Sequence, residues 1–221
     1  MPTIRTRLYP LRDVNDHDVI PFFSLDTSSG LAGQLVKIVT GAANPQNADG
    51  WSNTSVGTNV AGTFSNRYET KLKMTPTVSG DTRFNSLGVT LLSTLEYDEN
   101  QQPLKYNEKR AKEIGAVVSG ESVPVATKAS VLGIWGSNID QRFGAPAPGK
   151  LAVVSYSGNG TIGVVDPLSA NFAATATAVA YTQAHVVGKW ITTLPAASNT
   201  GLASEFSAQG GYALLQFNMN A

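Results

Sequence analysis

The stretch that decides the fold class is Leu151–Pro167, which reads LAVVSYSGNGTIGVVDP. Two runs of small and β-branched apolar residues, 151–155 and 161–165, flank the turn-forming segment 157–160. Its last two residues are Asn-Gly, the preferred pair for the type I′ turn that joins two antiparallel strands. The stretch therefore predicts a β-hairpin.

The same glycines also match the Gly-x-Gly-x-x-Gly pattern of dinucleotide-binding loops, at Gly158, Gly160 and Gly163. That loop requires a following helix, whose N-terminus binds the pyrophosphate, and an acidic residue about 20 positions further on. Here a strand-like run follows the glycines, and Gln183 stands at that distance. We therefore expect no dinucleotide site and predict no cofactor.

Similar strand-like runs, separated by turn residues, recur along the chain from residue 30 onward. Their spacing predicts a mainly β fold, an antiparallel barrel or sandwich, over residues 30–221. One short helix is expected over 106–114, because helix-favouring residues there end at Gly115. The alanine- and threonine-rich run 170–184 fits either a strand of small residues or a weakly amphipathic helix. The predicted strands are 33–40, 67–74, 88–95, 116–119, 122–126, 130–135, 150–157, 161–165, 174–182, 185–193 and 211–219.

Residues 1–29 differ from the rest, because no helical or strand period runs through the whole segment. They predict an extended N-terminal arm with one helical turn near 14–20. Large apolar side chains in such an arm are costly to expose, so the arm is expected to dock on a partner. The long polar loop 41–60 is also an interface candidate, and its tryptophan either anchors the loop or contacts a partner. The predicted interface residues are Arg5, Arg7, Tyr9, Phe22, Phe23 and Trp51.

The composition excludes several classes of site. The 221 residues include 16 basic and 16 acidic side chains and no cysteine. Without cysteine there are no disulfides, thiolate zinc sites, iron–sulfur clusters or cysteine nucleophiles. Zero net charge gives no general attraction to nucleic acid and permits close packing against other copies or a partner. No apolar run reaches the length of a membrane helix and no signal peptide is visible, so we expect synthesis in a cytoplasm and no membrane partner.

An acidic run near the N-terminus is the densest group of potential metal ligands. Carboxylates and an imidazole could together hold a divalent cation. The run lacks the glycine and the terminal glutamate of an EF-hand loop, and aspartate is common at helix starts, so capping is the favoured interpretation. We therefore predict no metal site. The residues concerned are Asp13, Asp16, His17 and Asp18.

Two further groups are candidates for chemistry. His185 lies in a strand-like run, and no Gly-x-Ser-x-Gly nucleophile motif occurs, so a half-buried, hydrogen-bonded histidine is expected. The basic residues Lys109, Arg110 and Lys112 have glutamates on both sides. That pattern favours a solvated helix face over a phosphate-binding patch. No catalytic residue is predicted.

Three phrases of the sequence carry a resemblance to a known group of proteins. They are LRDVNDHDVIPFF (11–23), GQLVKI (33–38) and VVSGESVPVATK (117–128). Over residues 1–135 the chain resembles small virion structural proteins of tailed bacteriophages, of the capsid-decoration (cement) or auxiliary head-protein kind. The resemblance implies a β-rich protein without catalytic residues on the capsid surface of the virion, made in the host cytoplasm. It implies binding to the major capsid protein and assembly into homotrimers or other homo-oligomers.

Three other functions stay open. A phage tail-tube or other tail structural protein would also be β-rich and free of cysteine. A glycan-binding head-fibre or adhesin module would use Trp51, Trp135, Trp190 and the long polar loop. An enzyme would be a hydrolase that uses paired carboxylates, but no pattern marks out such a pair. We therefore expect a structural protein and not an enzyme.

Overall fold

The computed structural model describes most of the predicted β region, and all statements below concern the described residues. They form two main sheets, one small sheet and a single α-helix, so the prediction of a mainly β fold with one short helix is confirmed. Most strand pairs are antiparallel, and three are parallel. The described residues are 8–10, 14–25, 30–38, 72–95, 97–118, 121–135, 139–156, 160–169, 172, 181–195 and 211–219.

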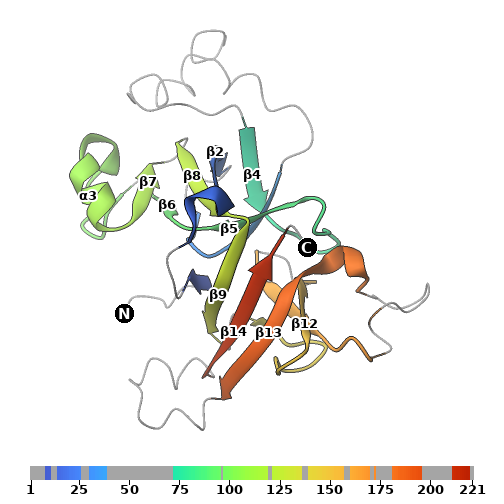
Figure 1. The fold of residues 1–221 in the computed structure, drawn as a ribbon. Coiled ribbons are helices and arrows are strands. Elements are labelled where there is room, and N and C mark those ends of the chain that lie inside the picture. Colours follow the sequence, from blue (N-terminus) through green and yellow to red (C-terminus); the bar gives the residue numbers. More distant parts are fainter. Residues whose placement is uncertain are drawn as a thin grey trace.

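The larger sheet has seven strands and forms the lower half of the molecule in Figure 1. Both of its edge strands are short: the first has three residues and ends in Pro10, and the last has two. In order across the sheet the strands are β1 (Leu8–Pro10), β9 (Lys128–Trp135), β14 (Gly211–Asn218), β13 (Val186–Pro195), β11 (Leu151–Val154), β12 (Ile162–Val165) and β10 (Ile139–Asp140).

The predicted hairpin lies in this sheet. β11 and β12 are antiparallel neighbours, with Val154 opposite Ile162. Gly160 precedes the second strand with φ +71°, a left-handed conformation that glycine adopts without strain. A Cβ there would lie 2.8 Å from the Leu35 carbonyl oxygen, so the close approach also requires glycine. A strand and not a helix follows Gly160, as the sequence predicts.

A second set of strands forms a five-stranded ring above the seven-stranded sheet (Figure 1). The last strand of the ring, β8, pairs with both β5 and β2, so the hydrogen-bonded order returns to its start. A ring of this kind leaves no strand edge open for pairing. In order the strands are β2 (Val19–Leu25), β4 (Leu72–Pro76), β3 (Leu35–Ile38), β5 (Ser86–Thr90) and β8 (Ser122–Ala126).

A small lobe is inserted between β5 and β8, and it projects from the ring in Figure 1. Its strands β6 (Ser93–Leu95) and β7 (Ala116–Val118) pair in parallel, and α3 (Glu108–Glu113) lies in the connection between them. The Asn107 side chain accepts a hydrogen bond from the Arg110 amide at the start of the helix. Gly115, with φ +62°, follows the helix as the sequence predicts.

The described residues of the N-terminal segment take part in both sheets. β1 pairs with β9 of the seven-stranded sheet, and β2 pairs with β4 and β8 of the ring. The helical turn expected near 14–20 is a 3-10 turn at Asp16–Asp18. The division of the chain at residue 29 stays a prediction. The loop 41–60 and the residues 173–180 lie outside the described part of the chain.

Strand β3 links the two halves of the core because its side chains alternate between two faces. Leu35 belongs to a cluster with Trp190 and Phe217 of the seven-stranded sheet. Its neighbour Val36 packs inside the ring with Met74. All five side chains are fully buried. Strand β5 does the same, with Val89 in the first cluster and Leu87 in the second, so the interiors of the ring and the sheet meet at these two strands.

Candidate functional site

The loop 77–85, between β4 and β5, crosses β3 and presents apolar side chains to solvent. At one end the Thr77 amide donates to the Leu35 carbonyl oxygen (3.0 Å), and at the other the Ile38 amide donates to the Asn85 carbonyl oxygen (3.1 Å). Around this loop, Ile38 is 38% exposed, Val78 49% and Phe84 74%. We call these three side chains, together with Arg83, the Phe84 surface.

A buried carboxylate braces this loop. Asp81 is 8% exposed, and its two oxygens accept hydrogen bonds from the Lys37 ammonium group (2.9 Å) and the Val78 amide (2.6 Å). The Asp81 amide in turn donates to the Val78 carbonyl oxygen (3.2 Å). Because both oxygens are bonded, the charge is satisfied and the loop has a defined shape. The exposure of Phe84 is thus a property of a braced loop.

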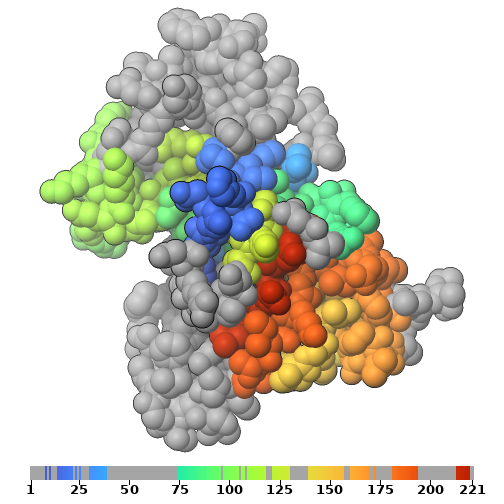
Figure 2. All heavy atoms as spheres, viewed as in Figure 1, coloured from blue at the N-terminus to red at the C-terminus, as the bar shows by residue number. Residues whose placement is uncertain are grey.

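The guanidinium group of Arg83 lies over the ring of Phe84, with Cζ 5.2 Å from the ring centroid. The amide of Arg83 donates to the Ala184 carbonyl oxygen at 2.7 Å. This bond ties the loop to the 3-10 turn Gln183–His185, which precedes β13; in Figures 1 and 2 the green loop meets the orange turn. An exposed aromatic ring beside an arginine is the composition that protein interfaces favour at their centres.

The turn Gln183–His185 packs against the buried side chain of Tyr181, which is 3% exposed. Its ring meets the rings of Phe143 and His185 edge to face, with centroids 5.3 Å and 5.7 Å away. Its hydroxyl oxygen accepts a hydrogen bond from the Tyr156 amide (3.0 Å). Burial raises the pKa of Tyr181 above 10.0, so this hydroxyl stays protonated at physiological pH.

His185 matches its sequence-based prediction of a half-buried, hydrogen-bonded histidine. Its Nδ1 accepts from the Thr182 amide at 3.0 Å. Nearby, the Ser155 hydroxyl donates directly to the Asp140 carboxylate at 2.9 Å. In a serine–histidine–aspartate triad the histidine would lie between the other two groups. Here the serine contacts the carboxylate directly, without a histidine between them.

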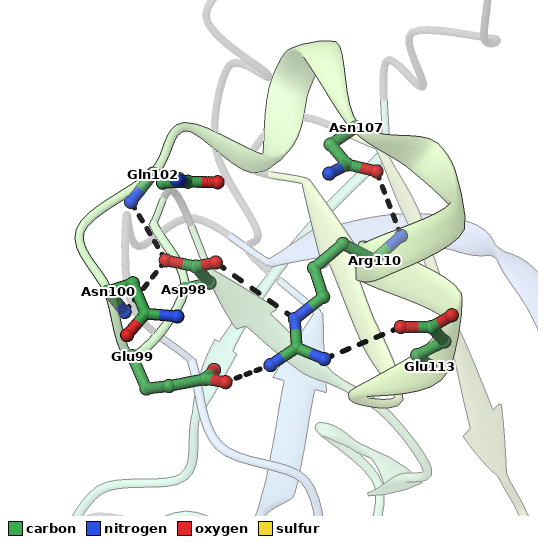
Figure 3. A network of polar contacts seen from close by, with 7 residues as sticks. All are labelled: Asp98, Glu99, Asn100, Gln102, Asn107, Arg110 and Glu113. Atoms are coloured by element: carbon green, nitrogen blue, oxygen red, sulfur yellow. Dashed lines mark hydrogen bonds and ion pairs between the residues drawn. The ribbon is translucent and has the colours of Figure 1, made fainter.

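The basic cluster of α3 forms a polar network in the lobe (Figure 3). Arg110 contacts three carboxylates: Asp98 (Nε to Oδ2, 4.0 Å), Glu113 (3.4 Å) and Glu99. Asp98 also accepts hydrogen bonds from two backbone amides of its own loop, at 2.8 Å each. Carboxylates therefore surround the central charge of the cluster, while Lys109 and Lys112 are exposed, as a solvated helix face predicts.

Of the predicted interface residues, the structure describes the side chain of Phe23 alone. Phe23 is 9% exposed and packs inside the ring of its own chain, so its side chain offers little surface to a partner. The reason is that β2 is a ring strand with neighbours on both sides. Tyr9 and Phe22 lie in β1 and β2, but their side chains lie outside the described part. The remaining predicted interface residues, Arg5, Arg7 and Trp51, also lie outside it.

The structure also describes part of the acidic run and one of the tryptophans considered for glycan binding. The acidic run contains the 3-10 turn at Asp16–Asp18, and Asn15 caps this turn. The Asn15 side chain accepts a hydrogen bond from the His17 amide at 3.1 Å. Asp13 lies outside the described residues. Within the described part of the chain, no three potential metal-ligating side chains of His, Cys, Asp or Glu gather at one place. Trp190, one of the tryptophans considered for glycan binding, is fully buried.

Sequence reasoning missed Phe84. The signal available was weak: one aromatic residue, next to an arginine, in a segment that otherwise contains turn-forming residues. Exposed aromatic residues in turns are also found with no functional role, and the sequence does not show that Asp81 braces the loop. The Phe84 surface became visible only when the burial of each side chain was known.

A scan against models of known protein families finds no match to this chain, and a search of curated protein sequences finds none either. In the described part of the chain, no helix has the length and apolar character needed to cross a membrane.

Proposed function

We propose that the chain is a structural virion protein: a decoration (cement) protein that binds the outside of a tailed-phage capsid and stabilises the lattice of the major capsid protein. The observation that carries this proposal is the Phe84 surface, where Ile38, Val78 and Phe84 stand exposed around a braced loop, with Arg83 against the Phe84 ring. Such a surface suits contact with another protein, because burying an aromatic ring contributes strongly to binding.

The bracing of the loop also favours binding. A loop held by Asp81 loses little conformational freedom when it docks, so the entropic cost of association is small. A protein that binds only the assembled lattice stabilises it by mass action. If the chain forms a homotrimer or other homo-oligomer, several modest contacts engage the shell together and avidity makes the attachment strong.

The test is co-sedimentation of the purified chain with emptied heads, and separately with tails, from the phage that encodes it. We expect the chain to sediment with heads in a saturable manner and to raise the temperature at which the heads disassemble. Sedimentation with tails alone would overturn the proposal in favour of a tail protein. Absence of binding to either would also overturn it.

A pair of variants tests the surface itself. Phe84→Ser removes the exposed ring, and Leu168→Ser makes a similar change at a side chain that is 94% exposed on another loop. Loss of a central aromatic contact typically costs about 2 kcal/mol or more, so Phe84→Ser should weaken head binding by about 30-fold. Leu168→Ser should bind like the unmodified chain. Equal affinities of all three proteins would remove Phe84 from the interface.

A further inference from the structure

The turn Thr182–His185 depends on an uncharged histidine. Nδ1 of His185 lies 3.0 Å from the Thr182 amide nitrogen, and the only hydrogen available on the amide points to the ring nitrogen. The Thr182 hydroxyl oxygen is also 3.0 Å from Nδ1. A ring nitrogen that accepts from a backbone N–H carries no proton of its own, so the ring is neutral, with its proton on Nε2.

The histidine occupies a position with a known structural requirement. Thr182 is the N-cap of the 3-10 turn and His185 is the third residue after it. In capping boxes this position is usually glutamate or glutamine, whose side chain accepts from the N-cap amide as His185 does here. Those side chains do not lose acceptor capacity near neutral pH. A histidine at this position makes the cap dependent on pH.

The same turn holds the Phe84 surface in place. The Ala184 carbonyl oxygen accepts from the Arg83 amide at 2.7 Å, and Arg83 lies against Phe84. The two contacts are adjacent in the chain, since Ala184 precedes His185. The position of this turn therefore sets the position of the carbonyl oxygen that holds the loop 77–85.

We propose that the turn Thr182–His185 is an acid-sensitive switch for the Phe84 surface. Protonation converts Nδ1 of His185 from an acceptor into a donor that faces the Thr182 amide, so this hydrogen bond breaks. The turn opens, Ala184 separates from Arg83, and the loop carrying Phe84 loses its support from the seven-stranded sheet. The consequence for capsid binding rests on the proposed function, whereas the switch itself is a property of the isolated chain.

The surroundings of His185 set the direction of the pH dependence. Burial lowers the pKa of His185 below its usual 6.5, and this effect outweighs that of a hydrogen bond with the Thr182 backbone, which raises the pKa. Tyr181, on the side of the seven-stranded sheet, is uncharged, and the nearby charges of Asp140 and Arg142 are of opposite sign. Arg83 lies on the side of the loop, where its amide donates to the Ala184 carbonyl oxygen.

The sign follows from proton linkage. In the opened turn His185 has its usual pKa of 6.5, and in the closed turn its pKa is lower. Between these two pKa values the opened turn binds more protons than the closed turn. The closed turn is therefore fully favoured above pH 6.5 and loses its advantage as the pH falls through this window. The closed-to-open ratio changes by up to about tenfold per pH unit.

NMR of the isolated chain between pH 7.5 and 5 tests the switch. The readouts are the amide signals of Thr182 and Arg83, their hydrogen-exchange protection, and the ring signals of His185. As the ring becomes protonated, we expect both amides to shift and to lose protection with the same midpoint. Amides that stayed protected around a protonated His185 would overturn the proposal.

Three variants sharpen the test. His185→Gln keeps an acceptor in the capping box without a titrating group, so both amides should remain protected across the pH range. His185→Phe keeps an aromatic ring but no acceptor, so both should be unprotected at every pH. His17→Gln changes the only other histidine, which is exposed, and should respond like the unmodified chain. A pH response that survived in His185→Gln would overturn the proposal.

Head binding then separates this inference from the proposed function. If the chain binds heads, its affinity should fall between pH 7.5 and 5, and the fall should be absent in His185→Gln. If the chain does not bind heads at any pH, the proposed function fails, while the NMR result still decides whether the switch exists.

Discussion

Replacing Leu35 by alanine tests whether the ring and the seven-stranded sheet unfold as one unit. Leu35 is fully buried, and its cluster contains Val89 of the ring and Trp190 of the sheet. The change removes three carbon atoms, a loss of about 2.4 kcal/mol at about 0.8 kcal/mol per buried methylene. The remaining cavity adds to this loss because its walls belong to two sheets. The free energy of unfolding should therefore fall by about 3–5 kcal/mol.

Urea unfolding followed by NMR distinguishes the two halves. The methyl signal of Met74 reports on the interior of the ring and the indole N–H signal of Trp190 reports on the sheet, since both side chains are fully buried. We expect the native signals to disappear at the same urea concentration in the unmodified chain, and to shift together in Leu35→Ala. Leu168→Ala makes the same change at a 94% exposed position and should alter stability by less than about 0.5 kcal/mol. Separate transitions for Met74 and Trp190, or a shift in only one of them, would refute the shared core.

Two further substitutions test the sheet and the lobe. Gly188→Ala places a Cβ 2.2 Å from the Gln216 carbonyl oxygen of β14, so it should lower the free energy of unfolding in urea by about 3 kcal/mol. The control Gly80→Ala has φ +87° but open space around it, and should lower that free energy by only about 1 kcal/mol. Equal losses in the two variants would contradict the close approach of β13 and β14. Arg110→Gln removes the partner of three carboxylates and should speed amide hydrogen exchange over residues 97–118 by about fivefold, corresponding to about 1 kcal/mol after allowance for solvent screening. The exposed Lys112→Gln should leave that exchange unchanged, and a similar effect of both variants would show that Arg110 has no special role.

The features that the sequence predicts correctly are those with local causes. The β11–β12 hairpin depends on turn residues between two β-branched runs, and α3 on helix-favouring residues that end at Gly115. Signals of this kind involve residues that are close in the chain, so they can be recognised without knowledge of the fold. The mainly β class follows from the repetition of such local signals.

The features that the sequence does not predict depend on contacts between residues that are distant in the chain. The closure of the ring requires β8 to pair with β2, about a hundred positions apart in the chain. The burial of Phe23 follows from that closure and not from its neighbours in the sequence. Phe84 is the opposite case: the Lys37–Asp81 contact braces the loop that leaves its ring exposed. Choosing candidate interface residues by type alone therefore selects Phe23, which is a core position, and misses Phe84, which is exposed.

The two edge strands of the larger sheet bear on how copies of this chain behave at high concentration. A free edge strand is a template on which other chains add without limit, and the product is a fibre or an aggregate. In the described part of the chain, one edge has three residues and ends in Pro10, which has no amide hydrogen, and the other has two residues. The backbone thus gives an incoming strand little to pair with. In the described part of the chain, addition of a strand at either edge is therefore limited to a few backbone hydrogen bonds.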